Sequence, residues 1–147
     1  MMRAEQNRLI TQTGAETPCG TLLRRYWQPV ALVEELDDRR PLRPVRVMGQ
    51  DMVLFRDEEG RYGLLDRDCP HRNADLAFGR LEDGGVRCLF HGWLFDVDGQ
   101  CIDTPAEPEG SRLCERVRQR SYPLEEHSGI LFAWLGEGEP PAFPALD

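Results

Sequence analysis

Two short stretches of the sequence each bring a cysteine and a histidine close together along the chain. Cys69 and His71 are separated by one residue, and Cys88 and His91 are separated by two residues. Cysteine thiolates and histidine imidazoles are the side chains that bind many transition metals. The chain has only three histidines, and these two boxes use two of them. The four residues are therefore candidates for a metal centre to which each box supplies one cysteine and one histidine.

The mixed composition of each box bears on which metal is bound. Zinc fingers usually take their ligands as like pairs, cysteines first and histidines afterwards. A cluster of two unlike irons accounts for the mixing if the two cysteines bind one iron and the two histidines bind the other, because two loops then clamp the cluster between them. That is the ligand set of a Rieske [2Fe–2S] centre. A zinc site is the alternative.

Two neutral imidazoles in place of two anionic thiolates make such a cluster easier to reduce, at roughly −150 mV or above instead of about −400 mV. Each imidazole keeps one N–H free for solvent or for a partner. The neighbouring residues suit this site. Pro70 is predicted to stiffen the first loop, and Gly92 to let the backbone approach the cluster. Phe90 and Trp93 are predicted to form an apolar wall, and Pro105 to close a third side.

The composition is that of a globular protein, and 147 residues predict one domain. The formal net charge is −8, and all 18 basic residues are arginines. This balance argues against nucleic acid or an anionic membrane as the main partner. No apolar run approaches the roughly 20 residues that span a bilayer, and the N-terminal stretch lacks a signal-peptide core, so we expect a cytoplasmic protein. Five cysteines, an odd number, make a poor disulfide framework there.

The elements that must hold the boxes are mainly short strands. Helices are predicted over residues 4–12 and 18–26, the second with Thr17 as N-cap and Pro18 in its first turn. From residue 27 onward, β-rich runs separated by turn signals predict a meander of antiparallel strands: QPVALVEEL, RPVRVM, DMVLFRD and RYGLLD. Two stretches, EDGG at 82–85 and DVDG at 96–99, predict hairpin turns, and RQRSYPLEE and GILFAWLG predict two more strands.

These patterns predict that the chain is divided into three parts. They are an N-terminal helical extension over 1–26, a metal-binding domain over 27–136 with its ligand loops at about 67–95, and a Pro- and Gly-rich exit linker over 137–147. Outside the boxes, Cys19, Cys101 and Cys114 are interpreted as small buried or half-buried thiols, and His127 as a surface turn residue.

The stretch CPHRNADL…CLFHGWLFD resembles the paired boxes of Rieske iron–sulfur domains, Cys-x-His and Cys-x₂-His. Respiratory Rieske proteins carry an extra cysteine in each box, and here those places hold Ala74 and Phe90. The stretches EQNRLITQTGAETPCGTLLRRYWQPVALVEEL and GQCIDTPAEPEGSRLCERVRQRSYPLEEHSGILFAWLG are similar to the N-terminal part of the α subunit of Rieske non-haem iron oxygenases, particularly the phthalate dioxygenase-like group. The likeness covers nearly the whole chain, with Asn73 where glycine is usual and Phe90 where tyrosine is common.

The resemblance implies an all-β fold of small antiparallel sheets with short N-terminal helices. It implies a Rieske-type [2Fe–2S] cluster bound by Cys69, His71, Cys88 and His91 and surrounded by Pro70, Phe90, Gly92, Trp93 and Pro105.

The resemblance also implies a function and its partners. Electrons would come from an NAD(P)H-dependent reductase or a ferredoxin and pass to a mononuclear iron that activates O₂ for aromatic hydroxylation or dealkylation. In this family that iron is held by two histidines and one carboxylate in a catalytic domain of a neighbouring subunit, to which His91 would offer its imidazole. Only His127 is left over here, so we expect this chain alone to lack the O₂-activating site. A stand-alone Rieske ferredoxin and a zinc-stabilised binding module without redox activity are the alternatives.

Overall fold

Two short helices begin the chain. The structure, a computed structural model, describes residues 2–37, 39 and 41–145. The helices span Ala4–Thr11 (α1) and Pro18–Leu23 (α2), and both end before their predicted limits. The Oγ1 atom of Thr17 accepts a hydrogen bond from the backbone N–H of Gly20 at 3.1 Å, so Thr17 caps α2 as predicted.

A three-stranded antiparallel meander forms the middle of the molecule. It consists of β2 (Leu42–Val47), β3 (Gln50–Arg56) and β4 (Tyr62–Asp66). Residues 52–55 of β3 are fully buried. Because successive residues of a strand point to opposite faces of a sheet, this burial means that both faces of the meander are covered.

A second sheet has the strand order β1–β10–β9. Its strands are β1 (Gln28–Leu32), β9 (Leu124–His127) and β10 (Ile130–Ala133), and a single 3-10 turn, η1 (Val33–Glu35), follows β1. The two strands predicted near the end of the chain are therefore confirmed. The prediction that the first strand belongs to the meander is wrong, because β1 pairs with β10, about a hundred residues away. A pairing at that separation leaves no local pattern in the sequence.

The third sheet holds the second Cys/His box between two of its strands, and the first box lies in the segment that leads into this sheet. Its strands follow chain order: β5 (Arg80–Glu82), β6 (Gly85–Arg87), β7 (Leu94–Asp96) and β8 (Cys101–Asp103). Both predicted hairpin turns are confirmed, one between β5 and β6 and the other between β7 and β8. The first box precedes a 3-10 turn, η2 (Leu76–Phe78), and the second joins β6 to β7. A helix of four residues, α3 (Leu113–Arg116), follows β8.

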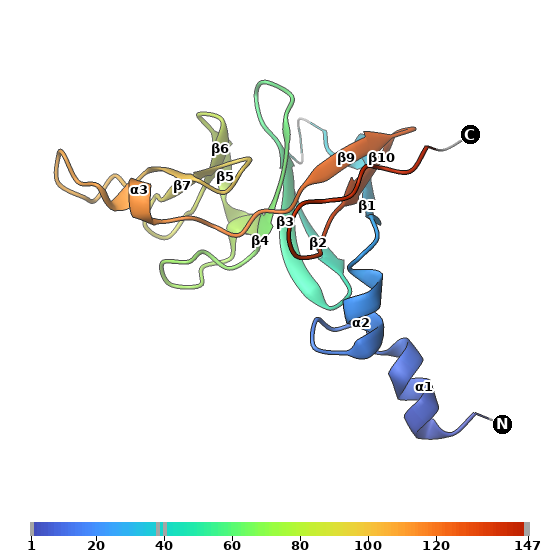
Figure 1. The fold of residues 1–147 in the computed structure, drawn as a ribbon. Coiled ribbons are helices and arrows are strands. Elements are labelled where there is room, and N and C mark those ends of the chain that lie inside the picture. The colour runs from blue at the N-terminus through green and yellow to red at the C-terminus, as the bar shows by residue number, and fades with distance from the viewer. Residues whose placement is uncertain (1, 38, 40, 146–147) are drawn as a thin grey trace.

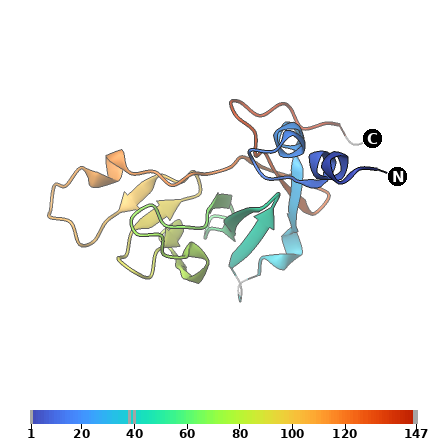
Figure 2. The same cartoon turned by 90° about the horizontal axis from the view of Figure 1, so that it is seen from below.

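The two faces of the meander build two separate cores. The core shared with the four-stranded sheet contains Val53, Phe55, Leu65, Cys69, Leu76, Val86, Cys88, Trp93, Phe95 and Cys101. The core shared with the β1–β10–β9 sheet contains Leu36, Met52, Leu54, Leu64, Tyr122, Leu131, Ala133 and Leu135. Figures 1 and 2 show the four-stranded sheet and α3 on one side of the meander, and α1, α2 and both chain ends on the other. The cysteines of both boxes therefore belong to the core that lies away from the chain ends.

The expected fold class is confirmed, since small antiparallel sheets follow two short N-terminal helices. Among the described residues, no helix has the length and apolar character needed to cross a membrane.

The C-terminal segment packs back onto the β1–β10–β9 sheet. Residues 137–145 form no helix or strand. The ring of Phe143 stacks on that of His127 at a centroid distance of 3.6 Å and also packs against Phe132 at 4.9 Å and Trp27 at 5.7 Å. His127 is the last residue of β9 and is covered by this ring. The interpretation of His127 as a turn residue is therefore wrong, because the turn follows it, but its side chain is 37% exposed and does lie at the surface.

Candidate metal centre

The two boxes fold into loops with the same backbone hydrogen bonds. In the first, the Cys69 N–H donates to the Ala74 carbonyl at 2.8 Å, and the Asn73 N–H donates back to the Cys69 carbonyl at 2.8 Å. In the second, the Cys88 N–H donates to the Trp93 carbonyl at 2.8 Å, and the Gly92 N–H donates back to the Cys88 carbonyl at 3.0 Å. Each cysteine thus closes a loop of the same length, and the histidine lies within it.

The fifth residue of each loop has a left-handed backbone. Asn73 has a φ of 54° and Gly92 a φ of 76°. Asparagine tolerates this region better than most residues, so Asn73 keeps the loop shape that glycine gives elsewhere. Gly92 is restricted for a second reason, because a Cβ atom there would lie 2.7 Å from the Cγ of Pro105. Pro105 therefore covers the second loop, as expected for a residue that closes one side of the site.

The four predicted ligands lie together. Cys69 is 1% exposed and Cys88 is 3% exposed, and the two thiols are close enough for Cys88 to raise the pKa of Cys69. The rings of His71 and His91 meet edge to face at a centroid distance of 4.5 Å. The described residues include no group of three or more Cys, His, Asp or Glu that would hold a single metal ion. The donors instead form one pair of thiols and one pair of imidazoles, which fits the like pairs expected for a cluster of two irons.

Aromatic side chains flank the two imidazoles on different sides. Trp93 is buried and stacks on His71, with ring centroids 4.3 Å apart and planes 5° apart. The Nδ1 atom of His71 is buried and has no hydrogen-bond partner. Phe90 packs on His91 at 4.1 Å but is 61% exposed, so it covers the imidazole only on one face. An unpartnered buried nitrogen is costly, and a bound metal would satisfy it.

Electrostatics of the protein alone favour the neutral forms of Cys69 and His91. Burial raises the pKa of the Cys69 thiol to about 11, against the opposing effect of the His71 and Arg72 backbone N–H groups. Desolvation lowers the pKa of His91, and the neighbouring His71 and Arg72 act in the same direction. Neutral imidazole is the form that binds a metal, whereas the thiolate must be stabilised by the metal itself.

The base of the first loop is held by side chains that were not predicted from the sequence to be important. Arg67 donates two hydrogen bonds to the carboxylate of Asp75, at 2.8 and 2.5 Å. Asp75 also caps η2 by accepting from the Ala77 N–H at 2.9 Å. The buried Gln119 donates to the carbonyls of Asp66 and Asp68, both at 2.7 Å. These contacts fix the chain on either side of the first box.

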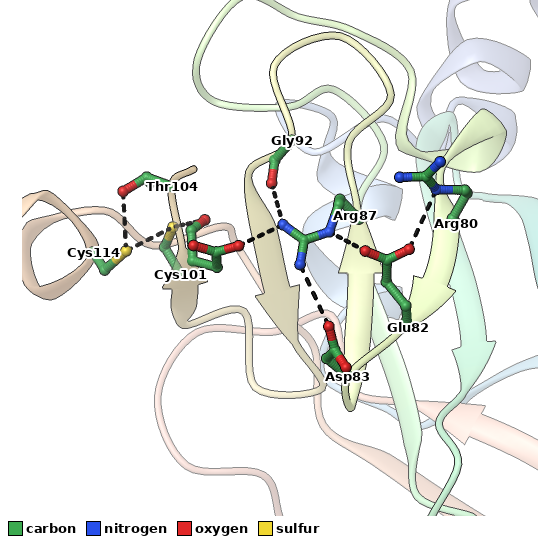
Figure 3. Close-up of polar contacts among 9 residues, drawn as sticks. Arg80, Glu82, Asp83, Arg87, Gly92, Cys101, Thr104 and Cys114 are labelled. Carbon is green, nitrogen blue, oxygen red and sulfur yellow. Dashed lines mark hydrogen bonds and ion pairs between the residues drawn. The ribbon is translucent and has the colours of Figure 1, made fainter. Parts of the chain in front are cut away.

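The second loop is braced by Arg87, the residue before Cys88. Its guanidinium donates to the Gly92 carbonyl at 2.6 Å and to the Asp103 carboxylate at 2.7 Å, and it also bonds Glu82 (Figure 3). The arginine was not predicted to matter, because only the pairing of β6 with β7 and of β7 with β8 brings these acceptors to it.

The remaining cysteines lie outside this arrangement. Cys101 is buried, and Cys19 and Cys114 are half-buried, as predicted. The sulfurs of Cys101 and Cys114 are 3.8 Å apart, and burial raises the pKa of Cys101 to about 12. The Cys101 thiol is therefore expected to stay protonated.

Comparison with known proteins defines the class of this chain. Residues 26–123 match the family described as the Rieske [2Fe-2S] domain. The chain is 45% identical over 148 aligned residues to the 5,5'-dehydrodivanillate O-demethylase oxygenase subunit of Sphingobium sp. (strain NBRC 103272 / SYK-6), which covers 98% of this chain and 34% of that protein. It is 41% identical to the phthalate 4,5-dioxygenase oxygenase subunit of Pseudomonas putida over 92% of this chain and 31% of that protein.

A solved structure gives the same result. Dicamba monooxygenase, crystallised with non-haem iron and dicamba, superimposes with a TM-score of 0.74 at 32% identity, over 85% of this chain and 38% of that one. The chain belongs to the Rieske [2Fe–2S] domain family, and its cofactor is a Rieske-type [2Fe–2S] cluster. These two relatives are oxygenase subunits, one of them of phthalate 4,5-dioxygenase, as the stretches outside the boxes implied, and the chain spans about a third of their length.

Proposed function

We propose that this domain carries single electrons on a [2Fe–2S] cluster whose ligands are Cys69, His71, Cys88 and His91. One observation carries the ligand set: the buried, unpartnered Nδ1 of His71 belongs to a ring that packs against the ring of His91, and the two loops that hold these rings each begin at a buried cysteine. When bound, the cluster supplies a one-electron redox centre of raised potential. Loops that close on two buried cysteines keep water away from the sulfurs.

The two histidines have different roles in this proposal. The His71 ring is fixed by stacking on Trp93, which holds its orientation. His91 is half-buried, with the exposed ring of Phe90 over one face and the edge of the His71 ring on another side. It can therefore present its free N–H edge to another protein, which makes it the exit point for the electron. Leu89 and Phe90, both exposed, offer apolar contact beside that edge.

The proposed partners follow from the relatives, which are named as oxygenase subunits. An NAD(P)H-dependent reductase or a ferredoxin would donate electrons, and a mononuclear-iron catalytic domain of a neighbouring subunit would accept them for aromatic hydroxylation or dealkylation. The division into an N-terminal extension over 1–26, a Rieske domain over 27–136 and an exit segment over 137–147 is part of this proposal, as is a cytoplasmic location.

Metal analysis and electron paramagnetic resonance test the ligand set. Anaerobically purified protein should contain equal amounts of iron and acid-labile sulfide, two of each per chain, and be red-brown. After reduction with dithionite it should give an anisotropic signal with the low average g value of two-histidine ligation. Cys19→Ser serves as the matched control for Cys88→Ser, since only the latter removes a proposed ligand. Stoichiometric zinc without iron, or a full cluster in Cys88→Ser, would contradict the proposal.

A further inference from the structure

The guanidinium of Arg87 holds a carbonyl of the second ligand loop from outside. Arg87 lies on β6, its side chain is 12% exposed, and its Nη1 donates to the Gly92 oxygen at 2.6 Å. Three carboxylates keep it in place: Asp103 at 2.7 Å, Asp83 at 3.6 Å, and Glu82 (Figure 3). Charged hydrogen bonds from several sides fix both the position and the plane of the guanidinium.

This contact fixes the orientation of one peptide group. The Gly92–Trp93 peptide is trans, since the described chain has no cis bonds, so its C=O and N–H point in opposite directions. Arg87 binds the oxygen on one side and thereby turns the Trp93 N–H to the other. That N–H has no acceptor among the described residues, whereas the Gly92 N–H is used by the Cys88 carbonyl. The loop thus contains an oriented donor with nothing of its own to bind.

The first loop has no equivalent contact. Arg67, the arginine at the base of the first loop, pairs with the side chain of Asp75 and donates no hydrogen bond to a carbonyl of the loop. The hydrogen bond from an arginine to a loop carbonyl, here called the carbonyl clamp, is therefore specific to the second loop. The loop shape that both loops share does not require it.

We propose that Arg87 is a positioning residue that directs the Trp93 N–H toward the cluster and thereby raises the cluster's reduction potential. The inference rests on the proposed ligand set. Hydrogen bonds to cluster sulfur stabilise the reduced, more negative state, and a donor that is held in place does so more effectively than one that reorients. The guanidinium of Arg87 acts through the Gly92 carbonyl, and its hydrogen bonds go to Gly92, Asp103 and Glu82 and to no side chain of a proposed ligand.

Arg87→Met removes the clamp, and Arg80→Met is its matched control. Arg80 lies on the neighbouring strand β5 and pairs with the same Glu82 at 3.3 Å, but it is 63% exposed and does not contact the loop. Both variants lose one positive charge from the same sheet. We expect Arg87→Met to lower the midpoint potential, to alter the g values of the reduced cluster, and to release iron to a chelator roughly tenfold faster, the effect of about 1.4 kcal/mol in a charged hydrogen bond. Arg80→Met should leave all three unchanged.

Arg87→Lys separates positioning from charge. Lysine keeps the positive charge but has no planar fork, so it cannot bind the Gly92 carbonyl and Asp103 together as arginine does. The positioning role predicts a lowered potential in Arg87→Lys and faster hydrogen exchange at residues 88–93. A purely electrostatic role predicts no shift. The three acidic partners are 34–76% exposed and stay hydrated when the arginine is gone, so the variants are expected to fold.

The outcomes are distinct. Wild-type potential and g values in both Arg87 variants, or equal shifts in Arg87→Met and Arg80→Met, would overturn the role of Arg87. Wild-type protein without a two-histidine signal would overturn the ligand set instead, before any variant is compared.

Discussion

The two imidazoles of the site differ in what surrounds them. His71 is stacked on Trp93 and has a buried nitrogen without a partner, whereas His91 is half-buried, has no such nitrogen and is covered on one face by the exposed Phe90. An unsatisfied buried donor or acceptor costs about 1–3 kcal/mol, so the His71 environment is completed only when that nitrogen is bound. The less enclosed His91 can meet a partner without a change in the fold.

Gly92 is the position in the site at which a side chain is least tolerated. In Gly92→Ala a side chain would be added at a φ of 76° and within 2.7 Å of Pro105, so we expect roughly 1–3 kcal/mol of destabilisation and faster cluster loss. Asn73→Ala has only the backbone penalty and should cost less. Iron release and urea midpoints would measure both. Because Pro105→Ala removes the steric conflict, Gly92→Ala/Pro105→Ala should recover part of the loss, and no recovery would contradict the contact.

Asp75 gives the first loop a dependence on acid pH. The hydrogen bond from Arg67 lowers the pKa of Asp75, with burial opposing it, so folding favours the carboxylate. This contribution to stability is present at pH values above the unfolded-state pKa of about 3.9. It is lost as the pH falls through the lower pKa of the folded state. We expect Arg67→Met to cost about 1 kcal/mol near neutral pH and progressively less below about pH 4.

Urea midpoints between pH 3 and 7 would check the role of Arg67. In an Asp75→Asn background the effect of Arg67→Met should lose its pH dependence, since the titrating partner is gone. A cost that is the same at every pH in the native background would rule out the pair as its source.

At the level of elements, the loops and hairpins could be predicted because their signals are local. Thr17 marks the start of α2, and the Gly-rich turns at 82–85 and 96–99 mark two hairpins of the four-stranded sheet. The pairing of β1 with β10 and the stacking of Phe143 on His127 could not be predicted, because both join residues that lie far apart and have no complementary pattern. Arg87 was missed for a related reason: its acceptors depend on strand register.

The ligand loops are expected to be the only elements that need the cluster. Val86 and Phe95, in the strands on either side of the second loop, are fully buried against the meander. We therefore expect Cys88→Ser and His91→Ala to lose the cluster and to gain hydrogen exchange at residues 69–74 and 88–93, while β2, β3 and β4 stay protected. Cys19→Ser should exchange as the wild type does. Global unfolding of the ligand variants by circular dichroism would contradict this expectation.

At the scale of the whole molecule, the meander separates the cluster side from the side of the helices and chain ends (Figure 1). The loops of the cluster side are thus open to another protein without interference from the N-terminal helices. The cofactor could be predicted from the sequence because four ligands at fixed spacing are enough to define it. The partner and the substrate could not be predicted from the sequence, because the residues that would contact them form no recognisable pattern in this chain.

The chain of 147 residues is expected to exchange single electrons with a reductase but to hydroxylate nothing by itself. O₂ activation on a mononuclear iron needs two histidines and a carboxylate with open positions on the metal. The chain has three histidines, and the proposed cluster uses His71 and His91, while His127 is stacked against Phe143. Mixing the protein with a reductase, NADH and aromatic acids should therefore reduce the cluster, which is seen by its bleaching, without substrate-dependent O₂ uptake. Hydroxylated product from this chain, in the absence of any added iron-domain protein, would require a second metal site and overturn the role of electron carrier.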